Sequence, residues 1–195
     1  MISTIILFIL FIVVVSTTLW LFLVSFSLWQ SSNQKTFYVS TPKHIAQKML
    51  ETLDAQKGRN LIDLGAGDGS ILRLSAQKHE TTSVGYEITM WPYLSSILKN
   101  YLFKKNNPQL KNLVQMHYSP ALDADVSEAD YIFLYTSPEF NQKLAYKLKR
   151  ELPTYSRIVS LTFPLPDWTA EEEITIGDYT YWLYLKAHNE SERSL

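Results

Sequence analysis

Apolar and polar residues are distributed unevenly along this chain, and the first feature that they predict is a long apolar helix. Residues 2–29 contain no charged side chain. At about 1.5 Å per residue, a helix of that length spans roughly 42 Å, which exceeds the hydrocarbon core of a bilayer at about 30 Å. A cleaved signal peptide carries basic residues before a shorter apolar stretch, whereas only Met1 precedes this one. We therefore expect residues 1–30 to be an uncleaved transmembrane anchor.

Polar residues follow the expected anchor. Residues 31–36 are predicted to form a linker that is too short to let the domain beyond it, residues 37–195, move far from a bilayer. The nearest charges are Lys35, Lys43 and Lys48. The positive-inside rule therefore predicts a single-pass membrane protein whose domain lies on the cytoplasmic or a matrix-like side.

Beyond the linker, the spacing of apolar residues predicts several helices. Thr41 and Pro42 suit the N-cap and first turn of a helix that should end at Lys57-Gly58. Pro92 and the pair Ser137-Pro138 are expected to open two more helices, and a fourth should follow residue 70. The apolar positions on these helices are, in chain order, Ile45, Ala46, Met49, Leu50, Leu53, Ile71, Leu72, Leu74, Ala76, Leu94, Ile97, Leu98, Tyr101, Leu102, Phe140, Leu144, Leu148 and Leu152.

Short apolar runs between these helices predict strands. Five runs alternate with the helices, and alternating Tyr and Trp residues near the end of the chain predict an antiparallel hairpin. Strand and helix in alternation indicate the α/β fold class, with a mainly parallel sheet. The expected strands cover residues 61–64, 83–87, 113–116, 131–135 and 157–161, and the hairpin covers 174–176 and 180–186.

Composition removes several classes of function. With the anchor set aside, the chain suits one domain of about 150 residues. Its 18 basic and 19 acidic residues nearly cancel, so charge gives no reason to expect a nucleic-acid partner. The chain has no cysteine, which excludes disulfides and cysteine nucleophiles. Its four histidines lack ligand spacing, so no metal site is expected, and no G-x-S-x-G elbow indicates a hydrolase.

The chemistry is expected around a glycine turn. Gly65, Gly67 and Gly69 follow a buried strand and precede a helix, which is a ligand-binding arrangement because glycine allows positive φ and close approach of the backbone. In a dinucleotide fingerprint, G-x-G-x-x-G, the third glycine would fall at Ser70. Glu87 ends the next predicted strand, where a carboxylate accepts hydrogen bonds from ribose hydroxyls. A nucleoside ligand other than NAD therefore fits better.

The stretch Asp63-x-Gly65-x-Gly67-x-Gly69 resembles motif I of the class I methyltransferases that use S-adenosylmethionine (SAM). That resemblance implies SAM as the cofactor, with Asp63 near the ammonium group of its methionine part. Many of these enzymes also hold the adenine with an acid after the third strand; here Asp123, Asp125, or Ser119 with backbone groups would serve. The implied cofactor-binding residues are Asp63, Gly65, Ala66, Gly67, Gly69, Glu87 and Ser119.

Five stretches in this order resemble a more particular family: residues 37–42 (Phe-Tyr-Val-Ser-Thr-Pro), 63–69, 85–87, 135–138 and 163–168 (Phe-Pro-Leu-Pro-Asp-Trp). It is the family of small membrane-anchored methyltransferases that includes the mitochondrial lysine methyltransferases of the ATP synthase c-subunit and of the adenine nucleotide translocase. The resemblance implies a class I methyltransferase (Rossmann-like) sheet with a C-terminal hairpin behind one transmembrane helix. It also implies a membrane-protein lysine as the methyl acceptor.

The reacting end is expected where the fourth strand ends, because open α/β sheets bind ligands at the carboxyl ends of their strands. No catalytic residue is assigned, and the candidates there are Tyr135, Ser137, Pro138 and Glu139. Glu139 equally suits a carboxylate that stabilises a helix N-terminus. Aromatic faces for a substrate ammonium are expected from Tyr135 and from the stretch 163–168. The candidate substrate residues in that stretch are Phe163, Pro164 and Trp168.

Other functions stay open at this point. One is a methyltransferase of a small or lipid-like molecule delivered from the bilayer. Another is a membrane-tethered module that binds SAM without catalysis. A nicotinamide dehydrogenase is disfavoured by the glycine spacing.

Overall fold

The chain forms two units that are described separately. A computed structural model describes residues 2–34 and 39–187. By its internal contacts the chain divides into Met1–Phe37 and Tyr38–Leu195.

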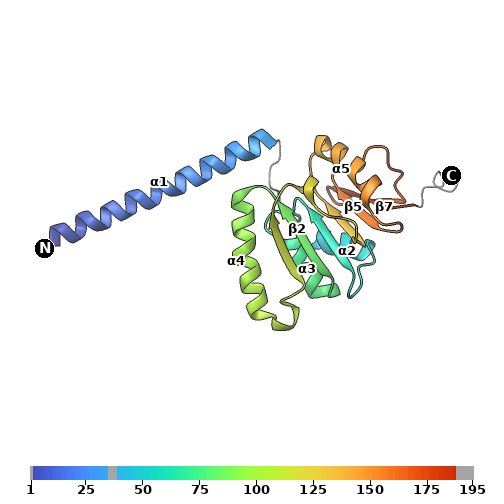
Figure 1. Cartoon of the computed structure of the whole chain (residues 1–195), viewed down its shortest axis with the longest axis horizontal. Coiled ribbons are helices and arrows are strands. Elements are labelled where there is room, and N and C mark those ends of the chain that lie inside the picture. The colour runs from blue at the N-terminus through green and yellow to red at the C-terminus, as the bar shows by residue number, and fades with distance from the viewer. Residues whose placement is uncertain (1, 35–38, 188–195) are drawn as a thin grey trace. The chain divides into compact units, whose positions relative to one another are not determined.

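The first unit is one helix, α1 (Ile2–Gln34) (Figure 1). Within it, Thr4–Phe26 is long and apolar enough to cross a membrane by length and composition, with a mean hydropathy of 2.8; a signal sequence near an N-terminus meets the same test. The helix continues past the predicted boundary at residue 30, because no proline or glycine interrupts it. Residues 31–34 are therefore helical rather than linker, and residues 35 and 36 of the predicted linker lie outside the described residues.

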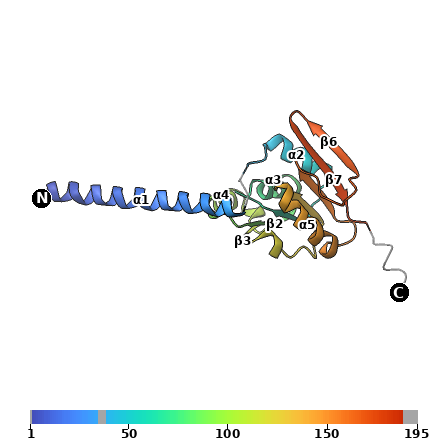
Figure 2. The ribbon, with the colours of Figure 1, turned by 90° about the horizontal axis from the view of Figure 1, so that it is seen from above.

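The second unit is built on a seven-stranded mixed sheet in the order β3-β2-β1-β4-β5-β7-β6. The first five strands are parallel, whereas β7 is antiparallel to both β5 and β6. The β6–β7 hairpin forms one end of the sheet (Figure 2). The strands are β1 (Asn60–Leu64), β2 (Thr82–Glu87), β3 (Val114–Tyr118), β4 (Tyr131–Leu134), β5 (Arg157–Leu161), β6 (Glu172–Ile176) and β7 (Tyr179–Leu185).

Helices cover both faces of this sheet. Alternate residues of each central strand enter different apolar clusters, so that Leu61 joins one and Ile62 the other. The first cluster includes residues of α2 and α3, and the second includes residues of α5. Burial on both faces explains why the central strands appear in the sequence as continuous apolar runs. The helices of this unit are α2 (Lys43–Thr52), α3 (Ser70–His79), α4 (Met90–Asn106) and α5 (Pro138–Glu151), with short 3₁₀ turns η1 (Pro108–Leu110) and η2 (Ala121–Asp123).

The predicted class I sheet and hairpin are confirmed, with shifted boundaries. α5 begins as predicted, since Ser137 is its N-cap and Pro138 its first residue. α2 begins later than predicted because Pro42, not Thr41, is its cap residue, and it ends at Thr52 rather than at residues 57–58. Asp54, with φ of 54°, has already left the helical conformation there.

α4 buries the side opposite to most of its large apolar residues. The apolar period is helical as expected, but the buried residues are Pro92, Ser96 and Asn100. The apolar positions that define the predicted helix lie on the exposed side: Leu94, Ile97, Leu98, Tyr101 and Leu102. The side against the sheet is small and polar because Asn100 makes a hydrogen bond there, accepting from Arg73 of α3 at 2.7 Å.

Gly85, in the middle of β2, is the tightest packing point of the described glycines. A Cβ atom built on it would lie 2.6 Å from both the Ala66 Cβ and the Met116 Sδ, and 2.8 Å from the Leu72 Cδ1. No side chain fits at these distances without backbone movement. The turn after β1 can therefore pack on β2 only because this residue is glycine.

We expect Gly85→Ala to lower the free energy of unfolding by about 1–3 kcal/mol, the usual cost of overpacking a core. Chemical denaturation measures it. In the matched control Gly177→Asn, the new side chain meets open space at a φ of 58°, which asparagine tolerates, so stability should change little. Equal stability of Gly85→Ala and the native protein would contradict the close packing.

Candidate functional site

The glycine turn between β1 and α3 has the backbone geometry that its sequence predicts. Gly65, Gly67 and Gly69 have φ values of 96°, 53° and 74°. L-amino acids with side chains rarely adopt this region, so all three positions favour glycine. A Cβ atom on Gly65 would also lie 3.2 Å from the Thr136 Cγ2, which places the turn against the chain that follows β4. The turn thus lies between β1 and β4, where the strand order reverses.

Glu87 holds this turn in place from the end of β2. Its side chain is buried, and its Oε2 accepts the N–H of Gly67 at 2.9 Å while its Oε1 accepts the N–H of Thr89 at 2.6 Å. The N–H groups of Gly65 and Ala66 both donate to the Tyr86 carbonyl at 3.0 Å. Each carboxylate oxygen keeps a further lone pair for a ligand hydroxyl.

Asp63 is a buried acid without a partner among the described residues. Its exposed fraction is 3%, and no described donor makes a hydrogen bond or ion pair with its carboxyl group. Burial raises the pKa of Asp63 well above its usual range, and the nearby carboxylates of Glu87 and Asp68 raise it further. Such a group is costly unless a cation or donor neutralises it. The ammonium group of SAM, the expected cofactor, has the positive charge that would neutralise the Asp63 carboxylate.

Asp68 forms an ion cluster that the sequence did not reveal. Its Oδ2 accepts from the Lys99 Nζ at 2.5 Å, and its Oδ1 lies 3.7 Å from the Arg73 Nη2. Burial alone would raise the pKa of Asp68, but the Lys99 hydrogen bond and the charges of Arg73 and Lys99 outweigh it and hold the pKa below its usual range. The cluster fixes the turn to both α3 and α4. Its only trace in the sequence is Lys99-Asn100, a polar pair inside an apolar helix.

Ser119 lies beside Glu87 at the ends of β3 and β2. Its N–H donates to the Glu87 carbonyl at 3.1 Å. Asp123 is exposed in η2, and the exposed Asp125 accepts from the Ser127 N–H and hydroxyl at 3.0 and 2.7 Å. A contact between Ser119 and adenine stays a prediction.

The candidate catalytic residues lie where β4 ends, at the same edge of the sheet. Tyr135 is half-buried and packs against the cluster shared by α2 and α3. The Ser137 hydroxyl accepts from the Phe140 N–H at 3.3 Å, so it caps α5. Pro138 and Glu139 are exposed in the first turn of α5. Their catalytic roles stay predictions.

Asn141 connects this edge to the Phe-Pro-Leu-Pro-Asp-Trp segment. It is fully buried in α5, and its Oδ1 accepts from the Thr136 hydroxyl at 2.5 Å. Its Nδ2 donates to the carbonyls of Phe163 at 3.0 Å and Pro164 at 3.3 Å. Two motifs that are 25 residues apart in the sequence are thus joined by one amide. Sequence reasoning missed it, because a single asparagine on a helix carries no motif.

Trp168, a predicted substrate residue, is engaged within the domain. Its indole N–H donates to the Ala145 carbonyl of α5 at 3.2 Å. Its ring meets Tyr184 edge-on with centroids 6.1 Å apart, and the Lys186 Nζ lies 6.0 Å above it. This ring fixes the segment onto α5 and β7, whereas Phe163 is half-buried and Pro164 exposed.

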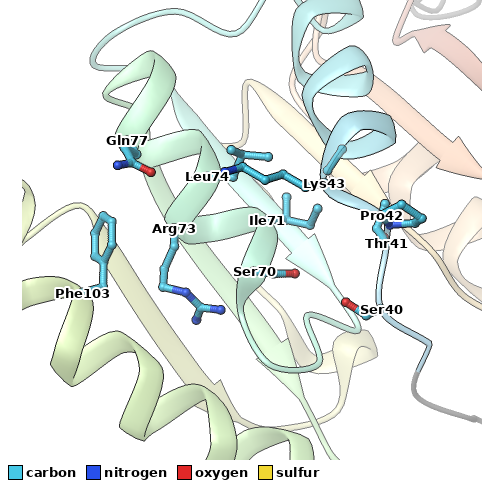
Figure 3. A pocket seen from close by; sticks show the side chains of 11 residues that line it. Ser40, Thr41, Pro42, Lys43, Ser70, Ile71, Arg73, Leu74, Gln77 and Phe103 are labelled. Atoms are coloured by element: carbon cyan, nitrogen blue, oxygen red, sulfur yellow. The ribbon is translucent and has the colours of Figure 1, made fainter.

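A cavity of about 550 Å³ lies beside the start of α3. Side chains of α3 reach it from one side and residues 40–43 from the other (Figure 3). It is lined by Ser40, Thr41, Pro42, Lys43, Ala46, Ser70, Ile71, Arg73, Leu74, Gln77 and Phe103. The described part of the Phe-Tyr-Val-Ser-Thr-Pro stretch thus adjoins the glycine turn, whereas Phe37 and Tyr38 lie outside the described residues.

Comparisons with known proteins agree with this geometry. A family model described as ANTKMT methyltransferase domain matches residues 63–172, more than half of the chain. The human lysine N-methyltransferase of the ATP synthase C-subunit is 28% identical over 148 residues, 76% of this chain and 60% of that protein. A protein-lysine N-methyltransferase of Saccharolobus islandicus is 29% identical over 156 residues, 76% of this chain and 92% of that protein. The chain thus spans only about 60% of the length of its human relative.

One solved structure combines sequence and fold similarity. It is an RNA methyltransferase from Salinibacter ruber in complex with S-adenosyl-L-homocysteine. It is 29% identical, with a TM-score of 0.69, and the alignment covers 77% of this chain and 95% of that one.

We expect Asp63→Asn to stabilise the ligand-free protein at neutral pH. An acid whose pKa is higher in the folded chain destabilises the fold above its ordinary pKa, because the unfolded chain loses the proton more readily. The gain in unfolding free energy should therefore be present at pH 7 and shrink as the pH falls toward 3.8, the ordinary value. Denaturation across pH measures it, with exposed Asp123→Asn as the control. A variant less stable than the native protein at pH 7 would indicate a partner for Asp63.

Asn141→Leu keeps the branched shape of the side chain but removes the amide. The Thr136 hydroxyl then loses its acceptor and the Pro164 carbonyl its donor, and both hydrogen bonds are partly buried. A buried polar group left unpaired costs about 1–3 kcal/mol, and a partly buried one costs up to that amount. We expect a loss of unfolding free energy in that range. Gln142→Leu, at the next and exposed position of α5, is the control and should change little. Similar stability of the two variants would rule out Asn141 as the connecting residue.

Proposed function

The chain belongs to the ANTKMT methyltransferase family, and on that premise we propose that it is a SAM-dependent protein-lysine methyltransferase. The observation that carries the proposal is Asp63, a buried acid without a described partner beside a glycine turn that Glu87 fixes. SAM offers both an ammonium group and ribose hydroxyls to these two carboxyl groups. The named lysine methyltransferases among the relatives support the choice of acceptor.

The residues present fit SAM. Asp63 would neutralise the ammonium group, the turn from Gly65 to Gly69 would let the ligand approach the backbone, and Glu87 would accept from the ribose. Ser119 would contact the adenine. The neighbour from Salinibacter ruber, which has the same fold, is described in complex with S-adenosyl-L-homocysteine, the product that SAM leaves after transfer. When bound, SAM supplies a methyl group on a positively charged sulfur.

The protein's own task in this reaction is to position a neutral amine and to exclude water. Methyl transfer is an in-line displacement, so orientation supplies much of the rate. A lysine amine, with a pKa of about 10.4 in water, must first lose its proton, and a partly desolvated pocket favours the neutral form. We assign Tyr135 and Phe163 to the walls of that pocket. Asn141 would act as a positioning residue, because it holds the chain after β4 against the Phe163 segment.

We further propose that the acceptor is a lysine of a membrane protein. The human relative is named for the C-subunit of ATP synthase, and Thr4–Phe26 is a candidate membrane span. Residues 27–34 continue α1 at about 1.5 Å per residue, and residues 35–38 add at most about 3.6 Å each, so the connection to the described part of the domain reaches at most roughly 26 Å. The domain would therefore search a thin layer next to the bilayer. Its lysines near the span favour the cytoplasmic or a matrix-like side.

The test combines purified full-length enzyme and radiolabelled SAM with detergent-solubilised membranes from cells that lack this protein. We expect a labelled protein band whose label lies on lysine. Glu87→Ala is the control, because loss of charged hydrogen bonds should weaken SAM binding by about 1.5–3 kcal/mol and lower labelling in parallel. Calorimetry on both proteins measures the binding.

Three other results would overturn the proposal. Label found only in the lipid extract would indicate a small or lipid-like acceptor. SAM binding without any labelled product would indicate a binding module. Binding of NADH but not SAM would exclude the methyltransferase reaction altogether.

A further inference from the structure

Helix α4 presents an apolar surface to the outside of the domain. Six large apolar or aromatic side chains on this helix are 44–63% exposed. They follow one another at steps of three, four and seven residues, which places them on one side of the helix. The opposite side holds the buried Pro92, Ser96 and Asn100. We call the exposed set the outer face of α4. It consists of Trp91, Leu94, Ile97, Leu98, Tyr101 and Leu102.

This arrangement is the reverse of an ordinary surface helix, which turns its apolar side to the core. The inward side is held by Phe103, which packs against the first apolar cluster, and by polar contacts: Asn100 accepts from Arg73, and Lys99 pairs with Asp68. The outer face is therefore not needed to attach α4 to the domain. A contiguous exposed patch of this kind marks a binding surface.

The charges on α4 indicate what this surface binds. From Met90 to Asn106 the helix has no acidic residue, and its last turn carries Lys104 and Lys105. Lys105 follows Leu98 by seven positions and so continues the outer face. Trp and Tyr rings within an apolar stripe, with lysines at its end, are the composition of helices that lie in a membrane interface.

We propose that the outer face of α4 lies on the surface of a lipid bilayer, with its apolar side chains at the boundary of headgroups and acyl chains. Lys104 and Lys105 then meet anionic headgroups. This lipid contact rests on the membrane location in the proposed function, because the candidate span Thr4–Phe26 would keep the domain within reach of a bilayer. A second copy of the chain fits less well, because its α4 has no acidic residue to pair with Lys104 and Lys105.

Contact with lipid at α4 would also orient the site. Thr89, the cap residue of α4, donates to the Glu87 carboxylate, and Lys99 holds Asp68 of the glycine turn. Tyr93 lies beside Tyr118 at the end of β3, with ring centroids 5.1 Å apart, and Tyr118 is 47% exposed. The carboxyl edge of the sheet therefore borders the proposed lipid-facing surface. An acceptor lysine would be presented near the depth of the headgroups.

The absence of cysteine from the chain allows a single-site test in the full-length protein. Leu98→Cys carries an environment-sensitive fluorophore on the outer face, and Tyr146→Cys, on the exposed side of α5, carries the same fluorophore as the control. Both proteins are reconstituted in vesicles of phosphatidylcholine with phosphatidylglycerol. We expect the label at 98 to shift to shorter wavelength and to lose about half of its emission to brominated lipids, since an interfacial helix buries its apolar side about 5–10 Å deep. The label at 146 should do neither.

Charge and position are tested separately. The double variant Lys104→Gln, Lys105→Gln should show a smaller wavelength shift of the label at 98 when anionic lipid is present, and an unchanged shift in neutral vesicles. A label at Leu94→Cys repeats the test in case the first variant does not fold. SAM binding by calorimetry in the same samples reports on the proposed function independently.

The inference fails if labels at both 94 and 98 stay water-exposed and unquenched in anionic vesicles while SAM still binds. It also fails if the label at 98 is shielded equally in detergent and in vesicles without quenching by lipid, because a protein surface then covers α4. Loss of SAM binding with normal quenching would instead contradict the proposed function and leave the lipid contact standing.

Discussion

The candidate site depends on one constraint: the turn after β1 must pass so close to β2 that backbone donors reach the end of that strand. Glu87 and the Tyr86 carbonyl accept three consecutive N–H groups of the turn, from Gly65, Ala66 and Gly67. This approach requires glycine in the turn for its φ values and glycine at position 85 for space. The candidate ligand surface is therefore formed by backbone that hydrogen bonds hold in place.

The same closeness makes the site electrostatically unbalanced. Asp63, Asp68 and Glu87 come together at one edge, and among the described residues only Asp68 of the three has cationic partners. Ionising Asp63 there is costly, which lowers the stability of the ligand-free domain and favours a cationic ligand. At Asp63 the requirement for ligand binding and the requirement for stability are thus opposed, as is usual at functional sites.

Two buried asparagines hold the segments next to the carboxyl edge of the sheet in place. Asn141 fixes the chain after β4 to the Phe163 segment, and Asn100 takes part in fixing α4 to the glycine turn. In both cases a buried amide is added to apolar packing and gives direction to the contact, because hydrogen bonds need a defined geometry. For α4 the consequence is an outer face left free of a structural task within the domain.

The sequence by itself determined the α/β class, the strands, the hairpin, the glycine turn and the place of Glu87. These follow from local rules, since apolar period, glycine conformation and helix caps act over a few residues. The sequence also predicted the helical period of α4. Only the tertiary structure decided which side of α4 is buried and that Asp68, Arg73 and Lys99 form one cluster. It alone joined Thr136 to Phe163 and Pro164 through Asn141. These contacts link residues that are far apart in the chain, and hydrogen bonds outweigh apolar character at α4, so no pattern within a single segment encodes them.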